Sequence, residues 1–375
     1  MSCPPQIPLF PPLSQNPQIT PLVNLNSIIQ TLAEDLTTLT SFKTRYFRSQ
    51  TGRRASEWLH NRIESLISGG AYDASVEYFN HTWIQPSVIA RLQGISNTTV
   101  IISSHIDSLN LNLPSLLPAP GANDDASGVS ALLSILQSLL SSPPLPLKNT
   151  LEFHFYSAEE AGLWGSNDIF STYNTLHKQI HSVLQLDMIG TPSAKIGIVT
   201  DFLPESFAGY ISHIATKYTS LTPVLTTCGY ACSDHASAIR YGYAGGLITS
   251  GTIPELSKAD YSHTKHDTMD KLSTPHIAEF VKFGIAWMVA LGTAELEVER
   301  RGYICDNGYP DGWMGTILRF STARAADPAG FGLWILAVVI LLAIARPWEE
   351  LPFLMRFCRK VKRRFRRGYT SLTGD

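Results

Sequence analysis

Six short motifs gather acidic and histidine residues of this chain, and three of the motifs follow apolar runs. S-H-I-D-S places His105 and Asp107 directly after one run, and A-E-E-A-G places Glu159 and Glu160 after another. L-Q-L-D-M-I-G ends a third run in Asp187. Imidazole nitrogens and carboxylate oxygens bind zinc, and a carboxylate beside a metal-activated water can act as a general base. These residue types therefore point to a metal site that activates water.

Each residue also has a purely structural interpretation, such as a hydrogen-bonded histidine or an acidic residue favoured at a helix N-terminus. We interpret His105 as a ligand and Asp107 as the carboxylate that accepts the other ring N–H and fixes the tautomer. Adjacent residues at a strand end point in different directions, so Glu160 is expected to bind metal while Glu159 faces the water as general base. An unpaired carboxylate is costly at the end of a buried strand, and metal ligation by Asp187 would remove that cost.

Two loops and one further motif supply the other candidates. P-G-A-N-D-D-A-S-G carries Asp124 and Asp125 before a predicted helix. One of the two is expected to cap this helix and the other, Asp124, to bridge two metal ions. S-H-T-K-H-D-T-M-D offers both His263 and His266, and S-D-H-A-S offers His235 as a candidate with no stronger claim.

The elements that must position these residues alternate between strands and helices. Hydrophobic periodicity predicts helices near residues 24–41, 53–67, 125–140, 161–175 and 275–296. Alternating and β-branched runs predict strands at 75–83, 87–92, 98–104, 150–157 and 182–186, with two further alternations to about 249. This order predicts an α/β fold, a three-layer α/β/α sandwich with a mixed, largely parallel central sheet. The ligand crevice of such a sheet lies beyond the carboxyl ends of its strands, where the motifs stand.

Length and composition limit the function classes. The 375 residues are 44% hydrophobic, which is enough for a sizeable core, and the net charge of −2 gives no reason to expect a nucleic-acid partner. We expect a Pro-rich arm at 1–20, a catalytic domain at 21–299 and a linker at 300–327. The N-terminus shows no recognisable signal peptide.

A transmembrane helix is expected at residues 328–345. This segment has no charged residue, and an Arg- and Lys-rich run follows it. Eighteen helical residues span about 27 Å, which is just enough for a hydrocarbon core. The positive-inside rule then predicts a basic cytosolic tail at 346–375 and a single-pass membrane protein, with the catalytic domain on the lumenal or extracellular side.

Cysteines and sequons give weaker signals about the compartment. Cys228 and Cys232 stand four apart, either as two unrelated thiols or as a short-loop disulfide. Asn80 and Asn97 open N-x-[ST] sequons, which predict glycosylation but also occur by chance. No obvious partner exists for the remaining cysteines, Cys3, Cys305 and Cys358.

Taken in order, the motifs H-x-D-S, P-G-A-x-D-D-A-S-G, A-E-E-x-G-x-x-G-S, L-Q-L-D-M, T-C-G-Y-A-C-S-D-H and H-T-x-x-D-T resemble a known family. It is that of the secreted leucine aminopeptidases of bacteria and fungi, which are co-catalytic two-zinc aminopeptidases of the MH clan. The resemblance covers residues 17–295. It implies Glu159 as general base and two Zn²⁺ ions, and it favours His263 because His266 falls on a variable position. It implies these ligands: His105 and Asp187 on one zinc, Glu160 and His263 on the other, and Asp124 on both.

The same resemblance implies a disulfide between Cys228 and Cys232 and places Met188, Tyr230 and Cys232 near the amino end of the substrate. The function it implies is hydrolysis of a Leu-like N-terminal residue from peptides with a free N-terminus, by a monomeric catalytic domain. Two alternatives stay open. One is an acyltransferase similar to glutaminyl cyclase, which uses a related fold with a single zinc. The other is a non-catalytic membrane receptor on the same fold.

Overall fold

The computed structural model describes residues 8–12, 16–70, 72–258 and 261–297, all within one compact unit, Met1–Tyr309. The α-helices are α1 (Leu25–Ser41), α2 (Gln50–Ile67), α3 (Ser127–Leu140), α4 (Trp164–Thr175), α5 (Glu205–Tyr218), α6 (His235–Arg240), α7 (Ile253–Lys258) and α8 (Thr274–Thr293). The strands are β1 (Ala74–Phe79), β2 (Ser87–Leu92), β3 (Ser96–His105), β4 (Asn149–Tyr156), β5 (Ile180–Leu186), β6 (Lys195–Val199), β7 (Thr222–Thr226) and β8 (Gly245–Ser250). Short 3-10 turns stand at Thr20–Leu22 and Met269–Lys271.

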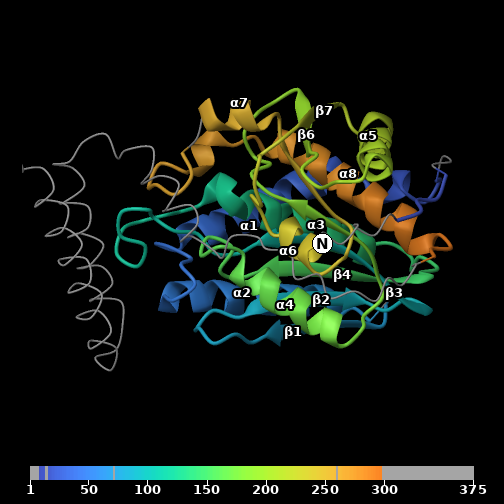
Figure 1. Ribbon diagram of the computed structural model, residues 1–375, viewed down its shortest axis with the longest axis horizontal. Coiled ribbons are helices and arrows are strands. Elements are labelled where there is room, and N and C mark those ends of the chain that lie inside the picture. Colours follow the sequence, from blue (N-terminus) through green and yellow to red (C-terminus); the bar gives the residue numbers. More distant parts are fainter. Residues whose placement is uncertain (1–7, 13–15, 71, 259–260, 298–375) are drawn as a thin grey trace, which may run out of the picture. The chain divides into compact units, whose positions relative to one another are not determined.

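Within these ranges the strands form one mixed sheet in the order β1-β2-β4-β3-β5-β8-β6-β7 (Figure 1). The centre is parallel, because β3 pairs in parallel with both β4 and β5, and β5 with β8. The antiparallel pairs are β1 with β2, β2 with β4, and β6 with β8. The expected mixed, largely parallel sheet is therefore confirmed, and the carboxyl ends of β4, β3 and β5 lie next to one another.

Side chains of the central strands alternate between two helical layers, as the period of a strand requires. Ile102 of β3 packs with residues of α3 and α8, whereas its neighbour Ile101 packs with residues of α4 and α6. The expected α/β/α sandwich follows from this alternation. Phe10 of the N-terminal arm joins the first layer, where its ring stacks on Tyr210 at 4.4 Å between centroids.

Polar caps set the starts of three long helices. The side chains of Asn24, Ser49 and Ser273 accept backbone N–H groups in the first turns of α1, α2 and α8. Such caps satisfy donors that a helix leaves unpaired at its N-terminus. The helix expected at 125–140 begins two residues later, because Asp124 and Asp125 have non-helical backbone angles in the turn that precedes α3.

A glycine brings α4 against the end of β4. A Cβ added to Gly165, the second residue of α4, would lie 2.0 Å from the carbonyl oxygen of Ser157. No side chain fits at that separation, so α4 can follow the turn after β4 only with glycine here.

The expected membrane-spanning helix requires a correction. Among the helices of the described ranges, none combines the length and the apolar character needed to cross a bilayer. The longest, α8, has 20 residues but carries Glu279 and Lys282. Residues 328–345, on which the expectation rested, lie outside the described ranges, as do the expected linker and basic tail. The predictions of a transmembrane helix and of a single-pass membrane protein therefore find no support among the described helices.

Replacing Gly165 by alanine is expected to lower the free energy of unfolding by about 1–3 kcal/mol, because the new methyl group overlaps a backbone oxygen. Gly209→Ala is the matched control, since Gly209 lies inside α5 with open space around its Cα. There alanine is expected to raise stability by about 0.5–1 kcal/mol through helix propensity. Urea unfolding of the two variants checks the signs. A Gly165→Ala protein as stable as the control would contradict the close approach.

Candidate metal centre and catalytic site

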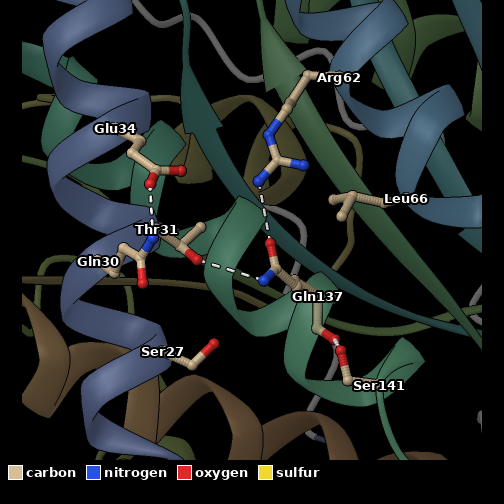
Figure 2. Close-up of a pocket in the computed structure, with 8 residues that line it drawn as sticks. All are labelled: Ser27, Gln30, Thr31, Glu34, Arg62, Leu66, Gln137 and Ser141. Atoms are coloured by element: carbon tan, nitrogen blue, oxygen red, sulfur yellow. Dashed lines mark hydrogen bonds between the residues drawn. The ribbon is translucent and has the colours of Figure 1, made fainter.

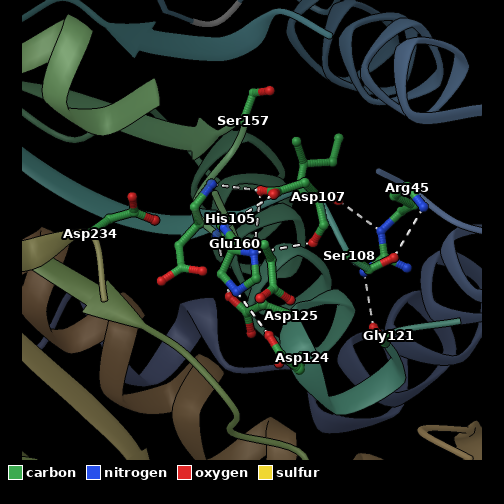
Figure 3. Close-up of polar contacts among 12 residues, drawn as sticks. Arg45, His105, Asp107, Ser108, Gly121, Asp124, Asp125, Ser157, Glu160 and Asp234 are labelled. Atoms are coloured by element: carbon green, nitrogen blue, oxygen red, sulfur yellow. Dashed lines mark hydrogen bonds and ion pairs between the residues drawn. The ribbon is translucent and has the colours of Figure 1, made fainter. Parts of the chain in front are cut away.

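Five predicted ligands converge at the carboxyl ends of the parallel strands, and Figure 3 shows three of them, His105, Asp124 and Glu160. His105 ends β3, Asp187 follows β5, and Glu160 stands in the turn after β4. Asp124 comes from the turn before α3, and His263 from the loop after α7. These residues form two groups that share one member, and within each group the ligand atoms lie within 4.8 Å of one another. The groups are His105, Asp124 and Asp187, and Asp124, Glu160 and His263.

The Asp124 carboxylate lies between the two histidines. Its Oδ1 is 3.0 Å from Nε2 of His105, and its Oδ2 is 3.2 Å from Nε2 of His263. The other carboxylate of each group lies near the histidine nitrogen that Asp124 faces in that group. Asp187 Oδ1 is 3.8 Å from His105 Nε2, and Glu160 Oε2 is 2.8 Å from His263 Nε2. One carboxylate thus offers one oxygen to each of two neighbouring positions.

The side chains of the two groups perturb each other's ionisation. Burial alone would lower the pKa of His263, but Glu160 and Asp124 outweigh it and raise that pKa to about 12. Burial would raise the pKa of Asp124, yet His105 and His263 hold it well below its usual range. Glu160 is the opposite case, because burial and the charge of Asp124 raise its pKa to about 7. The site therefore concentrates acidic groups whose ionised forms repel one another and are stabilised by nearby cations.

A divalent metal ion fits this donor set. Neutral imidazole and carboxylate are the ligands that zinc takes in catalytic sites. Glu160 Oε1 is buried and has no hydrogen-bond partner among the described residues, although an unpaired buried carboxylate oxygen is costly. A cation between the groups would satisfy this oxygen and would offset the repulsion among the carboxylates.

Asp107 holds the backbone that carries Glu159 and Glu160. Its Oδ1 accepts the N–H of Glu159 at 3.0 Å, and its Oδ2 accepts the N–H of Glu160 at 3.2 Å. Nδ1 of His105 lies 3.1 Å from the carbonyl oxygen of Asp107 and 3.6 Å from Oδ1. The ring nitrogen therefore bonds to the carbonyl, since 3.6 Å is too long for a hydrogen bond. The carboxylate, which we expected beside this ring, lies within ion-pair distance of it and also positions the turn after β4.

Asp125 joins three elements at the base of the site. Its carboxylate accepts the N–H of Gly128 at 3.0 Å, which caps the start of α3. It also accepts the N–H of His105 at 3.4 Å and that of Met188 at 3.3 Å, at the ends of β3 and β5. The sequence expectation that one residue of this acidic pair caps the helix is therefore met by Asp125, while Asp124 faces the histidines.

Three positioning residues escaped the sequence analysis. Asp267 accepts the backbone N–H groups of Asn123 and Asp124 at 2.8 and 3.0 Å and so joins their turn to the His263 loop. Ser233 donates a hydrogen bond of 2.6 Å to Asp187 Oδ2. The only signal for Asp267 was its place in H-T-x-x-D-T, and Ser233 had none beyond its neighbour Asp234.

Arg45 is the third of these residues, and it is fully buried (Figure 3). It donates to the carbonyl oxygens of Ile106 at 2.8 Å and Gly121 at 3.0 Å, and to that of Pro120. These carbonyls belong to the segments that follow His105 and precede Asp124. A buried guanidinium needs such acceptors, so Arg45 fixes the spacing between the two segments.

Glu159 is half-buried and takes no part in either ligand group. Burial raises its pKa well above the ordinary glutamate value, and the charge of Asp234 acts in the same direction. Asp234 is itself fully buried, and burial raises its pKa to about 8. A carboxyl group with a raised pKa beside a metal site is a stronger base than an ordinary carboxylate, which suits it to accept a proton.

The other predicted residues fall into distinct places. His266 is exposed, and His235 is buried in α6; neither belongs to a ligand group of the described residues. Cys228 and Cys232 form a disulfide, which agrees with the pairing that the resemblance implied. Tyr230, between them, is 66% exposed. Other predicted residues are half-buried or exposed on the surface: Met188 is half-buried after Asp187, and Asn80 and Asn97 are exposed.

A separate cavity of about 380 Å³ lies among α1, α2 and α3 (Figure 2). Its polar side chains bond to one another: Arg62 donates to Gln137, Gln137 donates to Thr31, and Gln30 donates to Glu34. Neither ligand group contributes a residue to its lining. The cavity therefore lies between polar side chains of neighbouring helices and is not part of the candidate centre.

Comparison with known proteins gives consistent matches. Residues 87–288 match peptidase family M28. The chain is 43% identical over 273 residues to leucine aminopeptidase 1 of Ajellomyces capsulatus, which covers 70% of both chains. It is 39% identical over 299 residues to leucine aminopeptidase 1 of Aspergillus fumigatus, with 76% of each covered. Among solved structures, the LapA aminopeptidase of Legionella pneumophila is similar at a TM-score of 0.70, with 26% identity and 77% of each chain covered.

Asp267→Asn is expected to weaken zinc binding by about 10- to 100-fold, as loss of support for metal ligands typically does. The amide keeps one acceptor oxygen and turns an NH₂ group toward the other backbone N–H, so the Asp124 turn loses a contact. Asp270→Asn is the control, because Asp270 is exposed and bonds to Thr268 and Lys271. Competition with a chromogenic chelator measures both affinities. Equal affinities in the two variants would remove Asp267 from the support of the site.

Proposed function

The chain belongs to peptidase family M28 and is a zinc-dependent aminopeptidase, and from this premise we propose which residues perform the reaction and how many ions they hold. Five residues would bind two zinc ions: His105 and Asp187 one, Glu160 and His263 the other, and Asp124 both. The position of Asp124 between two histidines, at 3.0 and 3.2 Å, carries this proposal. Two separate ligand groups with one shared carboxylate support a count of two ions.

Zinc bound there would lower the pKa of a water molecule and polarise the scissile carbonyl. Glu159 accepts the proton of the attacking water on its carboxylate and then donates it to the amide nitrogen as the C–N bond breaks. Asp107 holds the Glu159 backbone through a hydrogen bond of 3.0 Å, so the side chain is presented at a fixed place. Burial raises the pKa of Glu159, which makes its carboxylate a stronger base for the proton that it takes from water and then passes to the amide nitrogen.

The substrate class follows from the same site. A free N-terminal amine at the centre would restrict cleavage to the first residue, and Met188, Tyr230 and Cys232 are proposed to lie around that end of the peptide. The disulfide loop that carries Tyr230 is held at its start, because the Asp201 carboxylate accepts the N–H groups of Cys228 and Gly229 at 2.6 and 2.9 Å. An apolar first residue of the Leu type is proposed, with modest selectivity among apolar side chains.

Two other functions on this fold are not favoured. An acyltransferase with a single zinc would need one metal position, whereas two ligand groups are present here. A non-catalytic receptor would be expected to lack ligands or the base, yet all six positions carry residues able to perform their roles. We further propose glycosylation at Asn80 and Asn97, which their exposure permits.

Glu159→Gln is expected to lower kcat for leucine p-nitroanilide by about 100- to 10,000-fold, because the general base is lost. The metal content should stay unchanged, since Glu159 belongs to neither ligand group. Glu160→Gln is the matched neighbour and should lose metal as well as activity. Elemental analysis beside the kinetic assay separates the two. Full activity in Glu159→Gln would assign the base to another residue.

A chelator is expected to abolish activity, and zinc should restore it at two ions per chain. Asp124→Ala should retain less than one zinc per chain, because it removes a ligand from both positions. His263→Ala should retain one, because it leaves the group of His105, Asp124 and Asp187 complete. Zinc titration of the three proteins gives the counts. One ion per chain in the unsubstituted protein would contradict the two-ion proposal while leaving zinc dependence intact.

A further inference from the structure

A loop rich in exposed leucines follows the His105 motif. This leucine loop (residues 109–118) contains no charged side chain. Four of its five leucines are exposed, to 54%, 45%, 63% and 36%: Leu111, Leu113, Leu116 and Leu117. A cluster of large apolar side chains on one surface loop is unusual and commonly marks a binding surface.

Hydrogen bonds keep the leucine loop in one shape. At its base, Ser108 Oγ donates to the carbonyl oxygen of Ala119 at 2.8 Å, and the Asn110 amide donates to that of Pro118 at 3.0 Å. At its tip, the N–H groups of Leu116 and Leu117 donate to the carbonyl oxygen of Leu113 at 3.0 and 2.9 Å. The leucines are therefore displayed by an ordered backbone, so little entropy is lost when they bind a partner.

The loop lies beside the proposed metal centre. It begins four residues after His105, and the N–H of Leu111 donates to the carbonyl oxygen of His263 at 3.1 Å. Both contacts place it at the carboxyl edge of the sheet, where Figure 1 shows the teal segment after β3 extending beyond the strand. An exposed apolar surface is thus continuous with a residue of the candidate site.

We propose that the leucine loop binds apolar side chains of the substrate peptide downstream of the scissile bond, an inference that rests on the proposed function. The first residue of the peptide occupies the metal centre, so the rest of the chain must leave along the rim of the site. A rim segment without charge and with four exposed leucines favours apolar residues there through burial of nonpolar surface. The enzyme then selects peptides by residues beyond the one it removes.

The test compares two pentapeptides, Leu-Gly-Leu-Leu-Gly and Leu-Gly-Ser-Ser-Gly, with leucine p-nitroanilide as a reference that lacks the downstream residues. The unsubstituted enzyme is expected to cleave the apolar peptide with a higher kcat/KM than the serine peptide. In the double variant Leu113→Ser with Leu116→Ser, the ratio of the two kcat/KM values, apolar peptide over serine peptide, is expected to fall about tenfold, a change of about 1.4 kcal/mol. The change should appear in KM, because the contact is made equally in the bound substrate and in the transition state.

Two controls separate loop contacts from general effects. Leu113→Met with Leu116→Met keeps the apolar surface and should restore the ratio. Ile95→Ser replaces a side chain that is 89% exposed at the amino end of β3, and it should leave the ratio unchanged. A ten-residue strand separates Ile95 from the leucine loop, about 33 Å at the rise of an extended chain.

Several outcomes would overturn the proposal. One is that the unsubstituted enzyme cleaves both pentapeptides equally. Another is that the serine double variant keeps the full ratio of the two kcat/KM values. A serine variant that changes only the oligomeric state in size-exclusion chromatography would assign the leucines to contact with a second copy. If leucine p-nitroanilide and both pentapeptides all resist the zinc-loaded enzyme, the proposed function fails, and the substrate surface fails with it. Cleavage of leucine p-nitroanilide without any peptide preference removes the surface alone.

Discussion

Mutual repulsion among carboxylates is the constraint on which the rest of this structure depends. Eight acidic side chains meet at the carboxyl edge of the sheet, six of them buried and two, Glu159 and Asp187, half-buried. The buried ones are Asp107, Asp124, Asp125, Glu160, Asp234 and Asp267. Such a concentration is costly unless every charge is neutralised, hydrogen-bonded or bound to a cation.

The carboxylates divide into two kinds by their partners. Asp107, Asp125 and Asp267 each accept two or more backbone N–H groups, and they hold the loops that carry the others. Asp124 and Glu160 face histidine nitrogens instead, where a bound metal ion would satisfy them. The first kind determines where the second kind stands, since a ligand can be no better placed than the loop that carries it. The guanidinium of Arg45 adds a positive charge to this cluster. It also fixes the loops after His105 and before Asp124 through their carbonyl oxygens.

Backbone strain lies where the ligands are. Ala158 precedes Glu159, Met188 follows Asp187, and His263 is a proposed ligand itself; all three have positive φ angles between 52° and 57°. Left-handed angles cost a non-glycine residue roughly 1–2 kcal/mol, so these turns persist because the surrounding hydrogen bonds outweigh that cost. The sheet supplies the rigid frame for this, because three adjacent parallel strands end at one edge. The loops after these strands can then hold strained turns and, in residues 109–118, an exposed apolar surface.

The sequence by itself determined the elements and the residue types of the site. Hydrophobic periodicity is local, so it marked β3, β4, β5 and the long helices, and the motifs at strand ends and in two loops supplied the five candidate ligands. Only the tertiary structure decided the order of the strands, the choice of Asp125 as the cap, and the use of Asp107 for the turn after β4. It also decided the roles of Arg45 and Asp267. These depend on which loops meet across 60 to 150 residues of chain, and hydrogen bonds between distant backbone groups leave no periodic trace in the sequence.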